Sequence, residues 1–165
     1  MGFIFQQPSL LKNLNLLDNI ILTSIRENKK SAKEIIVRAE GLMEKVGIGE
    51  LKDRSIHRVS GGQLQRAGIC RALMNRPKIL FGDEPTGALN SKAAEEIMDI
   101  FTDINEEGTA IMLVTHDAKV AAGAERVVFM KDGELVSQLN LGKRKGGNMD
   151  MRIGKIREEM ERAGI

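Results

Sequence analysis

The sequence predicts an α/β fold, with a mostly parallel β-sheet and a helical block inserted between its first and second strands. After residue 76, short apolar runs of strand character alternate with helical patterns. Strands that alternate with helices pair in parallel through right-handed crossovers. Between residues 10 and 75 the apolar residues follow the helical period. The strands of the sheet are therefore expected both before and after this helical block in the sequence.

The N-terminal part should contain one strand and three helices. Residues 2–6 are apolar enough for a short buried strand, which Pro8 breaks. The helices are expected at 14–25, after the capping box Ser31–Glu34, and at 63–75. In a capping box the serine and the glutamate each satisfy a backbone donor that the first turn leaves unpaired. The third helix should close before Pro77, which disfavours helical geometry at the preceding residue.

The C-terminal part should alternate strands and helices. Strands are expected at 79–81, 109–114, 126–131 and 134–139, and helices at 91–107, 117–122 and 149–162. Asp132-Gly133 predicts a tight hairpin turn between the last two strands. Residues 143–147 form a basic, glycine-rich stretch that predicts a linker.

Composition excludes several classes of protein. The net charge of +2 gives no electrostatic reason to expect nucleic acid as a partner. The single cysteine, Cys70, excludes an internal disulfide and is expected in the core. No apolar run approaches the length of a membrane-spanning helix. These features predict a soluble intracellular protein.

The run Val59–Arg66 is the most informative segment. Ser60, Gly61, Gly62 and Gln63 stand directly before a predicted helix. Two glycines allow a close backbone approach, and a hydroxyl with free N–H groups at a helix N-terminus suits an anion such as a terminal phosphate. A glycine turn with a serine N-cap is the alternative interpretation.

Two further motifs follow predicted strands. Asp83 and Glu84 end the strand that begins at Ile79, and His116 follows the strand that ends at Val114. The carboxyl ends of parallel strands form the edge where α/β proteins bind ligands. Acidic groups there suit Mg²⁺ and the activation of water.

Taken in order, these motifs closely resemble those of ATP-binding-cassette (ABC) ATPases over residues 2 to about 140. The resemblance implies a P-loop NTPase (RecA-like) sheet, with Ser60–Gln63 as the signature loop that contacts the γ-phosphate of ATP. It implies that Asp83 holds Mg²⁺ through water, that Glu84 polarises the attacking water and that His116 senses the γ-phosphate. Gln6 matches the Q-loop glutamine that touches Mg²⁺ or water, with Gln7 as the alternative.

Thr86–Asn90 lies where the family carries its D-loop, which crosses the dimer interface. The family usually has aspartate at the last position, and Asn90 keeps the capping oxygen but lacks the charge. The segments around Phe5–Ile20 and Gly87–Ser91 look most like the branch that serves lipoprotein release or the export of peptide and macrolide antibiotics.

The pattern Gly-x-x-x-x-Gly-Lys-[Ser/Thr], which family members carry before the Q-loop, is absent. This Walker A loop cradles the β- and γ-phosphates. The chain therefore resembles the C-terminal part of an ATPase, and little hydrolysis is expected from it alone. The resemblance also implies that the Walker A strand sits beside the His116 strand, so that its loss leaves strand edges unpaired.

The expected organisation is an incomplete ABC ATPase domain at 1–142, with a helical subdomain at about 10–75 and a catalytic core at about 76–140, followed by a linker and helix at 143–165. The expected function is the ATP-binding subunit of an ABC transporter, with a transmembrane permease and a second ATP-binding subunit as partners, at the inner face of the cell membrane. The alternative is a non-catalytic partner that lends its signature loop to a complete ATPase. A chromosome-organising ATPase is excluded, because no heptads separate Gln6 from Ser60.

Overall fold

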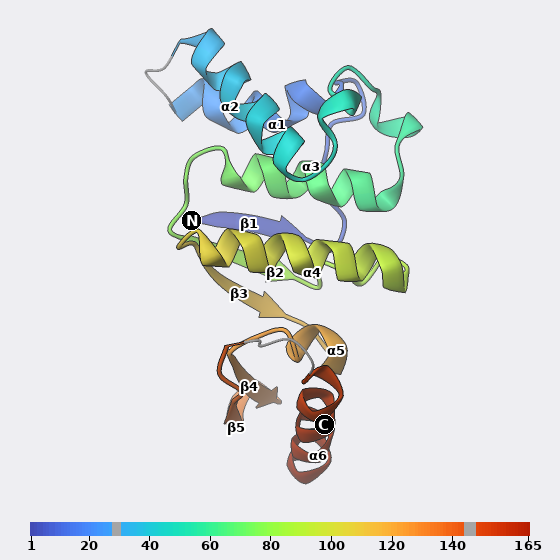
Figure 1. Ribbon diagram of the computed structural model, residues 1–165, viewed down its shortest axis with the longest axis vertical. Coiled ribbons are helices and arrows are strands. Elements are labelled where there is room, and N and C mark those ends of the chain that lie inside the picture. Colours follow the sequence, from blue (N-terminus) through green and yellow to red (C-terminus); the bar gives the residue numbers. More distant parts are fainter. Residues whose placement is uncertain (28–30, 144–147) are drawn as a thin grey trace. The chain divides into compact units, whose positions relative to one another are not determined.

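The computed structural model describes residues 1–27, 31–143 and 148–165 and divides into two compact units, Met1–Val114 and Thr115–Ile165 (Figure 1). Most of the expected linker, residues 144–147, lies outside the described residues. The first unit contains β1 (Gly2–Phe5), α1 (Leu16–Glu27), α2 (Ala32–Lys45), the 3-10 turns η1 (Gly49–Leu51) and η2 (Ile56–Arg58), α3 (Gly61–Leu73), β2 (Ile79–Asp83), α4 (Ser91–Glu106) and β3 (Ala110–Val114). The second contains α5 (Ala118–Ala121), β4 (Arg126–Lys131), β5 (Glu134–Asn140) and α6 (Met149–Ala163).

Every expected helix and strand is confirmed with small shifts of its ends, and among the described residues only the two 3-10 turns were not expected. The local signals act as predicted. Ser31 Oγ accepts from Glu34 N at 3.3 Å while the Glu34 carboxylate accepts from Ser31 N at 2.9 Å, which closes the capping box of α2. Asp132 and Gly133 both have positive φ, 51° and 84°, as a two-residue hairpin turn requires.

The predicted parallel sheet is confirmed in the first unit. Its strands lie in the order β1-β2-β3, and both pairings are parallel. The helical block lies between β1 and β2 in the sequence. Because these two strands pair, the chain enters and leaves the block at the same place, beside the sheet (Figure 1). In the second unit β4 and β5 form an antiparallel hairpin, with a bulge between Phe129 and Met130.

Helix α3 separates two apolar cores of the first unit. One core joins α3 to α1 and α2, through residues such as Ala67, Cys70 and Met74. The other joins α3 and α4 to one face of the sheet, through Ile69 and Leu73. Cys70 is fully buried as expected, and burial raises the pKa of its thiol to about 12.

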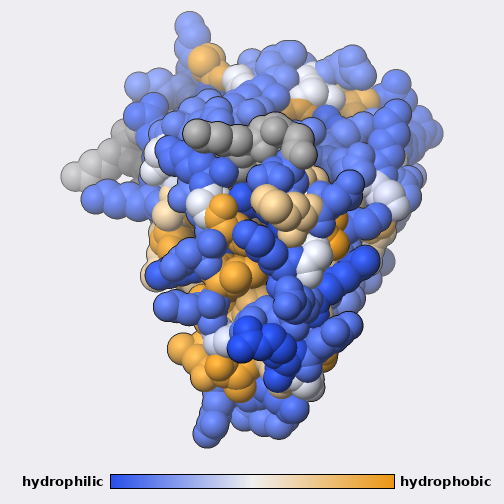
Figure 2. All heavy atoms as spheres, turned by 60° about the horizontal axis from the view of Figure 1, so that its bottom comes forward, coloured by the Kyte–Doolittle hydropathy of each residue, from blue (hydrophilic) through white to orange (hydrophobic). Residues whose placement is uncertain are grey.

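The other face of the sheet is uncovered in the described residues. Phe3, Phe5, Met112 and Val114 are 48–58% exposed there, and the rings of Phe3 and Phe81 stack with centroids 5.5 Å apart. The expectation that the first strand is buried is therefore wrong for its two phenylalanines, because α3 and α4 cover only the face to which Ile4 points. Figure 2, which brings the bottom of Figure 1 forward, shows hydrophobic patches among hydrophilic side chains on that side of the molecule.

Within the described part of the chain, no helix has both the length and the hydropathy needed to cross a membrane.

Helix α6 is fixed in the second unit by a buried arginine. Arg152 is only 4% exposed. Its Nε donates to Ala122 O at 2.7 Å and its Nη2 to Ala124 O at 2.6 Å, while Nη1 donates to Leu141 O at 3.0 Å. The guanidinium therefore joins α6 to the end of α5 and to the end of β5.

The variant Arg152→Met should destabilise the second unit by roughly 3 kcal/mol, because several buried carbonyls lose charged donors at once. The free energy of opening, from hydrogen exchange of the α6 amides, measures this loss. Arg157→Met removes an exposed arginine from the same helix and is the matched control. Equal exchange in the two variants would contradict the structural role of Arg152.

Candidate functional site

The carboxyl end of β2 carries the two expected acids. Asp83 is exposed and Glu84 is half-buried. Glu84 adopts φ of +44°, in the left-handed region that non-glycine residues rarely occupy. Its backbone is held on both sides, since Glu84 N donates to Val114 O at 2.9 Å and Glu84 O accepts from Gly87 N at 3.0 Å. Such strain at a sheet edge is typical of functional positions.

Gln6, directly after β1, lies against the loop that follows β2. A Cβ built on Gly87 would lie 2.9 Å from Gln6 Nε2 and 3.4 Å from Glu84 O. Glycine at 87 therefore leaves the space that the Gln6 amide occupies. The structure brings Gln6 together with the Glu84–Gly87 loop, although Gln6 and the alternative residue, Gln7, are both exposed.

The segment Ser60–Gln63 opens α3 with a second capping box. Ser60 Oγ accepts from Gln63 N at 3.3 Å, and Gln63 Oε1 accepts from Ser60 N at 2.8 Å. Gly61 and Gly62 occupy the first two helical positions, whose amides have no partner within a helix. The serine N-cap interpretation is thus confirmed, and the glycine amides still point out of the helix end.

The same end of α3 packs against the loop and helix that follow Glu84. A Cβ on Gly62 would lie 3.3 Å from Ala93 Cβ, and one on Gly61 would lie 3.7 Å from Leu89 Cδ2. Asn90 caps α4, since its Oδ1 accepts from Ala93 N at 2.9 Å. The capping role expected for Asn90 is confirmed, and the Ser60–Gln63 segment and the start of α4 are neighbours.

His116 belongs to the second unit, and the structure describes its surroundings only there. It is exposed, between Thr115 and Asp117. Asp117 N donates to Thr115 Oγ1 at 3.1 Å, and Asp117 Oδ1 accepts from Lys119 N at 2.7 Å to cap α5. The histidine therefore lies on a short, hydrogen-bonded turn directly after β3.

A sequence profile described as ABC transporter matches residues 1–87. The chain belongs to the ABC transporter family. The uncharacterized ABC transporter ATP-binding protein YknY of Bacillus subtilis is 48% identical over 82% of this chain and 59% of its own length. The lipoprotein-releasing system ATP-binding protein LolD of Aquifex aeolicus is 43% identical over 84% of this chain and 62% of its own. The macrolide export ATP-binding/permease protein MacB of Aggregatibacter actinomycetemcomitans is 43% identical over 82% of this chain but only 21% of its own.

Solved structures of the family share the fold. The dimeric bacterial ABC transporter cassette MJ0796 is 38% identical and superposes with a TM-score of 0.77, over 87% of this chain and 64% of that one. A dimer of the same cassette in a post-hydrolysis state is bound to ADP and Pi and gives a TM-score of 0.76. The chain thus has a partial P-loop NTPase fold and spans less than two thirds of the length of these relatives.

The arrangement of oxygen atoms fits a shared rather than a self-contained metal site. Among the described residues, no group of three or more His, Cys, Asp or Glu could hold a metal ion. Mg²⁺ usually takes one or two protein oxygens and completes its shell with water and substrate phosphates. One exposed carboxylate, Asp83, fits that mode of binding.

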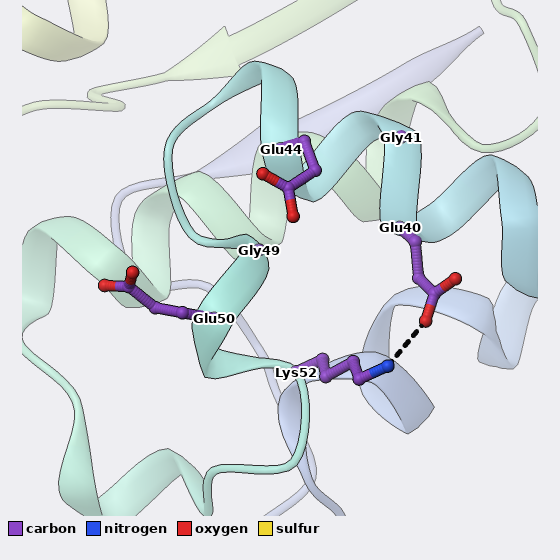
Figure 3. A pocket seen from close by; sticks show the side chains of 6 residues that line it. All are labelled: Glu40, Gly41, Glu44, Gly49, Glu50 and Lys52. Atoms are coloured by element: carbon purple, nitrogen blue, oxygen red, sulfur yellow. Dashed lines mark hydrogen bonds and ion pairs between the residues drawn. The ribbon is translucent and has the colours of Figure 1, made fainter.

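A pocket of about 530 Å³ lies elsewhere, on α2 and η1 (Figure 3). It is lined by Glu40, Gly41, Glu44, Gly49, Glu50 and Lys52. Lys52 Nζ lies 2.8 Å from Glu40 Oε1, and this hydrogen bond raises the pKa of Lys52. None of the expected site residues lines this acidic pocket, so it is no part of the ABC site described above.

Two side chains that no sequence motif singles out bind the backbone on either side of Gln6. Gln65 Nε2 donates to Phe5 O at 3.0 Å, and Arg71 Nη1 donates to Ser9 O at 2.6 Å. Both lie on α3. The sequence gives one signal for them. Gln65 stands three positions before Gly68 and Arg71 three positions after it, so all three share one face of the helix.

Proposed function

We propose that this chain is the hydrolytic and signature-bearing part of an ATP-binding subunit that drives an ABC transporter. The contact of Gln6 with the Glu84–Gly87 loop carries the proposal. This contact lies at the carboxyl end of the parallel strands, which is the edge where such sheets bind ligands. Membership of the family and the similarity to ATP-binding proteins support ATP as the substrate.

Within this site we assign Asp83 to Mg²⁺, through water, and Gln6 to the metal or its water. The bound ion would neutralise charge on the phosphates. Glu84 would orient and polarise the attacking water, because a carboxylate within hydrogen-bond reach of a water can act as its general base. His116 would donate a hydrogen bond to the γ-phosphate.

The signature loop Ser60–Gln63 would act on ATP held by a second chain. Its glycine amides form an anion site at a helix N-terminus, while Ser60 and Gln63 preform the turn through their capping box. Asn90 would lie at the interface between the two chains. The dimeric structures of the MJ0796 cassette support such a pair.

The phosphate cradle would come from polypeptide outside these 165 residues. The exposed apolar face with Phe3, Phe5, Met112 and Val114 supports this, since a neighbouring segment that covers it would bury substantial apolar area. The organisation into helical subdomain (about 10–75), core (about 76–140) and C-terminal linker with helix (143–165) remains part of the proposal. So do the permease partner, which the helical subdomain would dock, and a location at the inner face of the membrane.

The isolated 165-residue chain should hydrolyse ATP no faster than buffer. Phosphoryl transfer depends on positioning and on neutralising charge, and no phosphate-binding Gly-x-x-x-x-Gly-Lys pattern is present. Phosphate release is the measurement, with Glu84→Gln as the control for a contaminating ATPase. Turnover that Glu84→Gln abolishes would contradict this prediction.

The absent phosphate-binding pattern also favours a second candidate function, a non-catalytic partner that lends Ser60–Gln63 to a complete ATPase. A completed cassette, in which a segment with the phosphate-binding pattern precedes residue 1, separates the two. The main proposal expects that this cassette hydrolyses ATP and that Glu84→Gln stops it. The alternative expects no hydrolysis until a separate, complete ATPase is added.

In the completed cassette, Ser60→Arg should abolish ATP-driven dimerisation while the ATP affinity of the monomer changes little. The arginine side chain would fill the space that a partner's phosphate needs, whereas the contacts within one chain lie elsewhere. Size-exclusion chromatography reports the dimer and equilibrium titration the affinity. A large loss of monomer affinity would place the loop in its own chain's site.

A further inference from the structure

One face of α3 holds the chain segment that contains Gln6. Gln65 Nε2 donates to Phe5 O at 3.0 Å, and Arg71 Nη1 donates to Ser9 O at 2.6 Å. Between them a Cβ on Gly68 would lie 3.0 Å from Pro8 Cβ, which is tight packing. Residues three apart on a helix share a face. Three consecutive positions on this face of α3 therefore contact the segment on both sides of Gln6.

Gln65 is the buried member of this set. It is 1% exposed, so its amide is removed from water. Burial of an amide costs free energy unless it is hydrogen-bonded, and an apolar side chain of similar size would avoid that cost. The Phe5 carbonyl provides the hydrogen bond. This hydrogen bond therefore offsets the cost of burying the Gln65 amide.

The Phe5 carbonyl belongs to the same peptide unit as the backbone N–H of Gln6. Because the peptide group is planar and rigid, fixing Phe5 O also fixes the orientation of Gln6 N and Cα. The Gln6 side chain then extends to Gly87, where only the absence of a Cβ leaves room for it. Gln65 thus acts on the Glu84–Gly87 loop through Gln6.

The same helix begins with the signature loop. Ser60 precedes Gln65 by five residues, about 7.5 Å along a helix axis. We propose that Gln65 is a positioning residue that ties the Gln6 segment to α3, so that Gln6 and the Ser60–Gln63 loop of one chain move together. Such a linkage would carry a signal between hydrolysis in one ATP site and the signature-loop contact in the other. This purpose rests on the proposed function.

The test is amide NMR spectroscopy of the 165-residue chain without nucleotide. Gln65→Met keeps the length and flexibility of the side chain but removes the donor. The backbone amide resonances of Gln6 and Gln7 should shift, since the Phe5 carbonyl of the adjoining peptide unit loses its donor. Gly87 should shift as well, because the Gln6 side chain leaves it. A purely local packing role would leave Gly87 unchanged.

Gly68→Ala tests the same linkage without removing any hydrogen-bonding group. Alanine favours the helix over glycine, yet its methyl group would lie 3.0 Å from Pro8 Cβ and must push Pro8 aside. The shifts at Gln6 and Gly87 should therefore appear although every hydrogen-bonding group is kept. This variant keeps the inference testable if Gln65→Met folds poorly.

Arg38→Met is the matched control. Arg38 also donates from its side chain to α3 carbonyls, at Leu73 and Met74, but on the side of α2. It should perturb amides near those two residues and leave Gln6 and Gly87 unchanged. Wild-type shifts at Gln6 and Gly87 in both Gln65→Met and Gly68→Ala would overturn the inference. A completed cassette that fails to hydrolyse ATP would instead overturn the proposed function and leave these shifts unaffected.

Discussion

The packing of α3 between the helical block and the sheet is the constraint on which the first unit depends. Opposite faces of α3 enter the two cores, with Cys70 on one and Ile69 on the other. The approach to β1 is so close that a Cβ on Gly2 would lie 2.7 Å from Ala72 O. A helix buried on two sides has little freedom to tilt, because protein interiors are densely packed. The Ser60–Gln63 segment at its start and the Gln6 segment beside it therefore share one rigid support.

Side chains of α3 and α2 reinforce this support through bonds to backbone carbonyls. Arg66 Nη1 donates to Val46 O at 2.6 Å and its Nη2 pairs with Glu96 at 2.6 Å, which joins α3 to the end of α2 and to α4. Arg38 donates from α2 to the last turn of α3, where carbonyls lack partners within the helix. Partial burial lowers the pKa of Arg38, but a guanidinium stays charged at any working pH. These bonds are therefore expected to persist across the pH range in which ATPases work.

Local signals predicted most of the fold, and long-range contacts explain what they missed. Apolar periodicity located the helices and strands, and the caps at Ser31 and Asn90 followed from residue type. Periodicity does not show which face of a sheet other segments cover, so the exposure of Phe3 and Phe5 was not anticipated. The order of the motifs identified Glu84 and Gln6. The left-handed backbone of Glu84 could not be predicted, because such a conformation is usually indicated by glycine and this position is a glutamate. The bond from Gln65 to Phe5 joins residues 60 apart in sequence, beyond the reach of any local pattern.

A mixed-dimer complementation assay tests most directly whether each ATP site combines Glu84 of one chain with the signature loop of another. Completed cassettes carrying Glu84→Gln or Ser60→Arg should each be inactive alone. When they are mixed, a hybrid dimer keeps one site with both Glu84 and Ser60 intact. ATP hydrolysis should then reappear, at up to roughly half of the wild-type rate per hybrid dimer, since each hybrid keeps one of its two sites complete. Absence of any recovery, with hybrid dimers shown to form, would contradict the two-chain site.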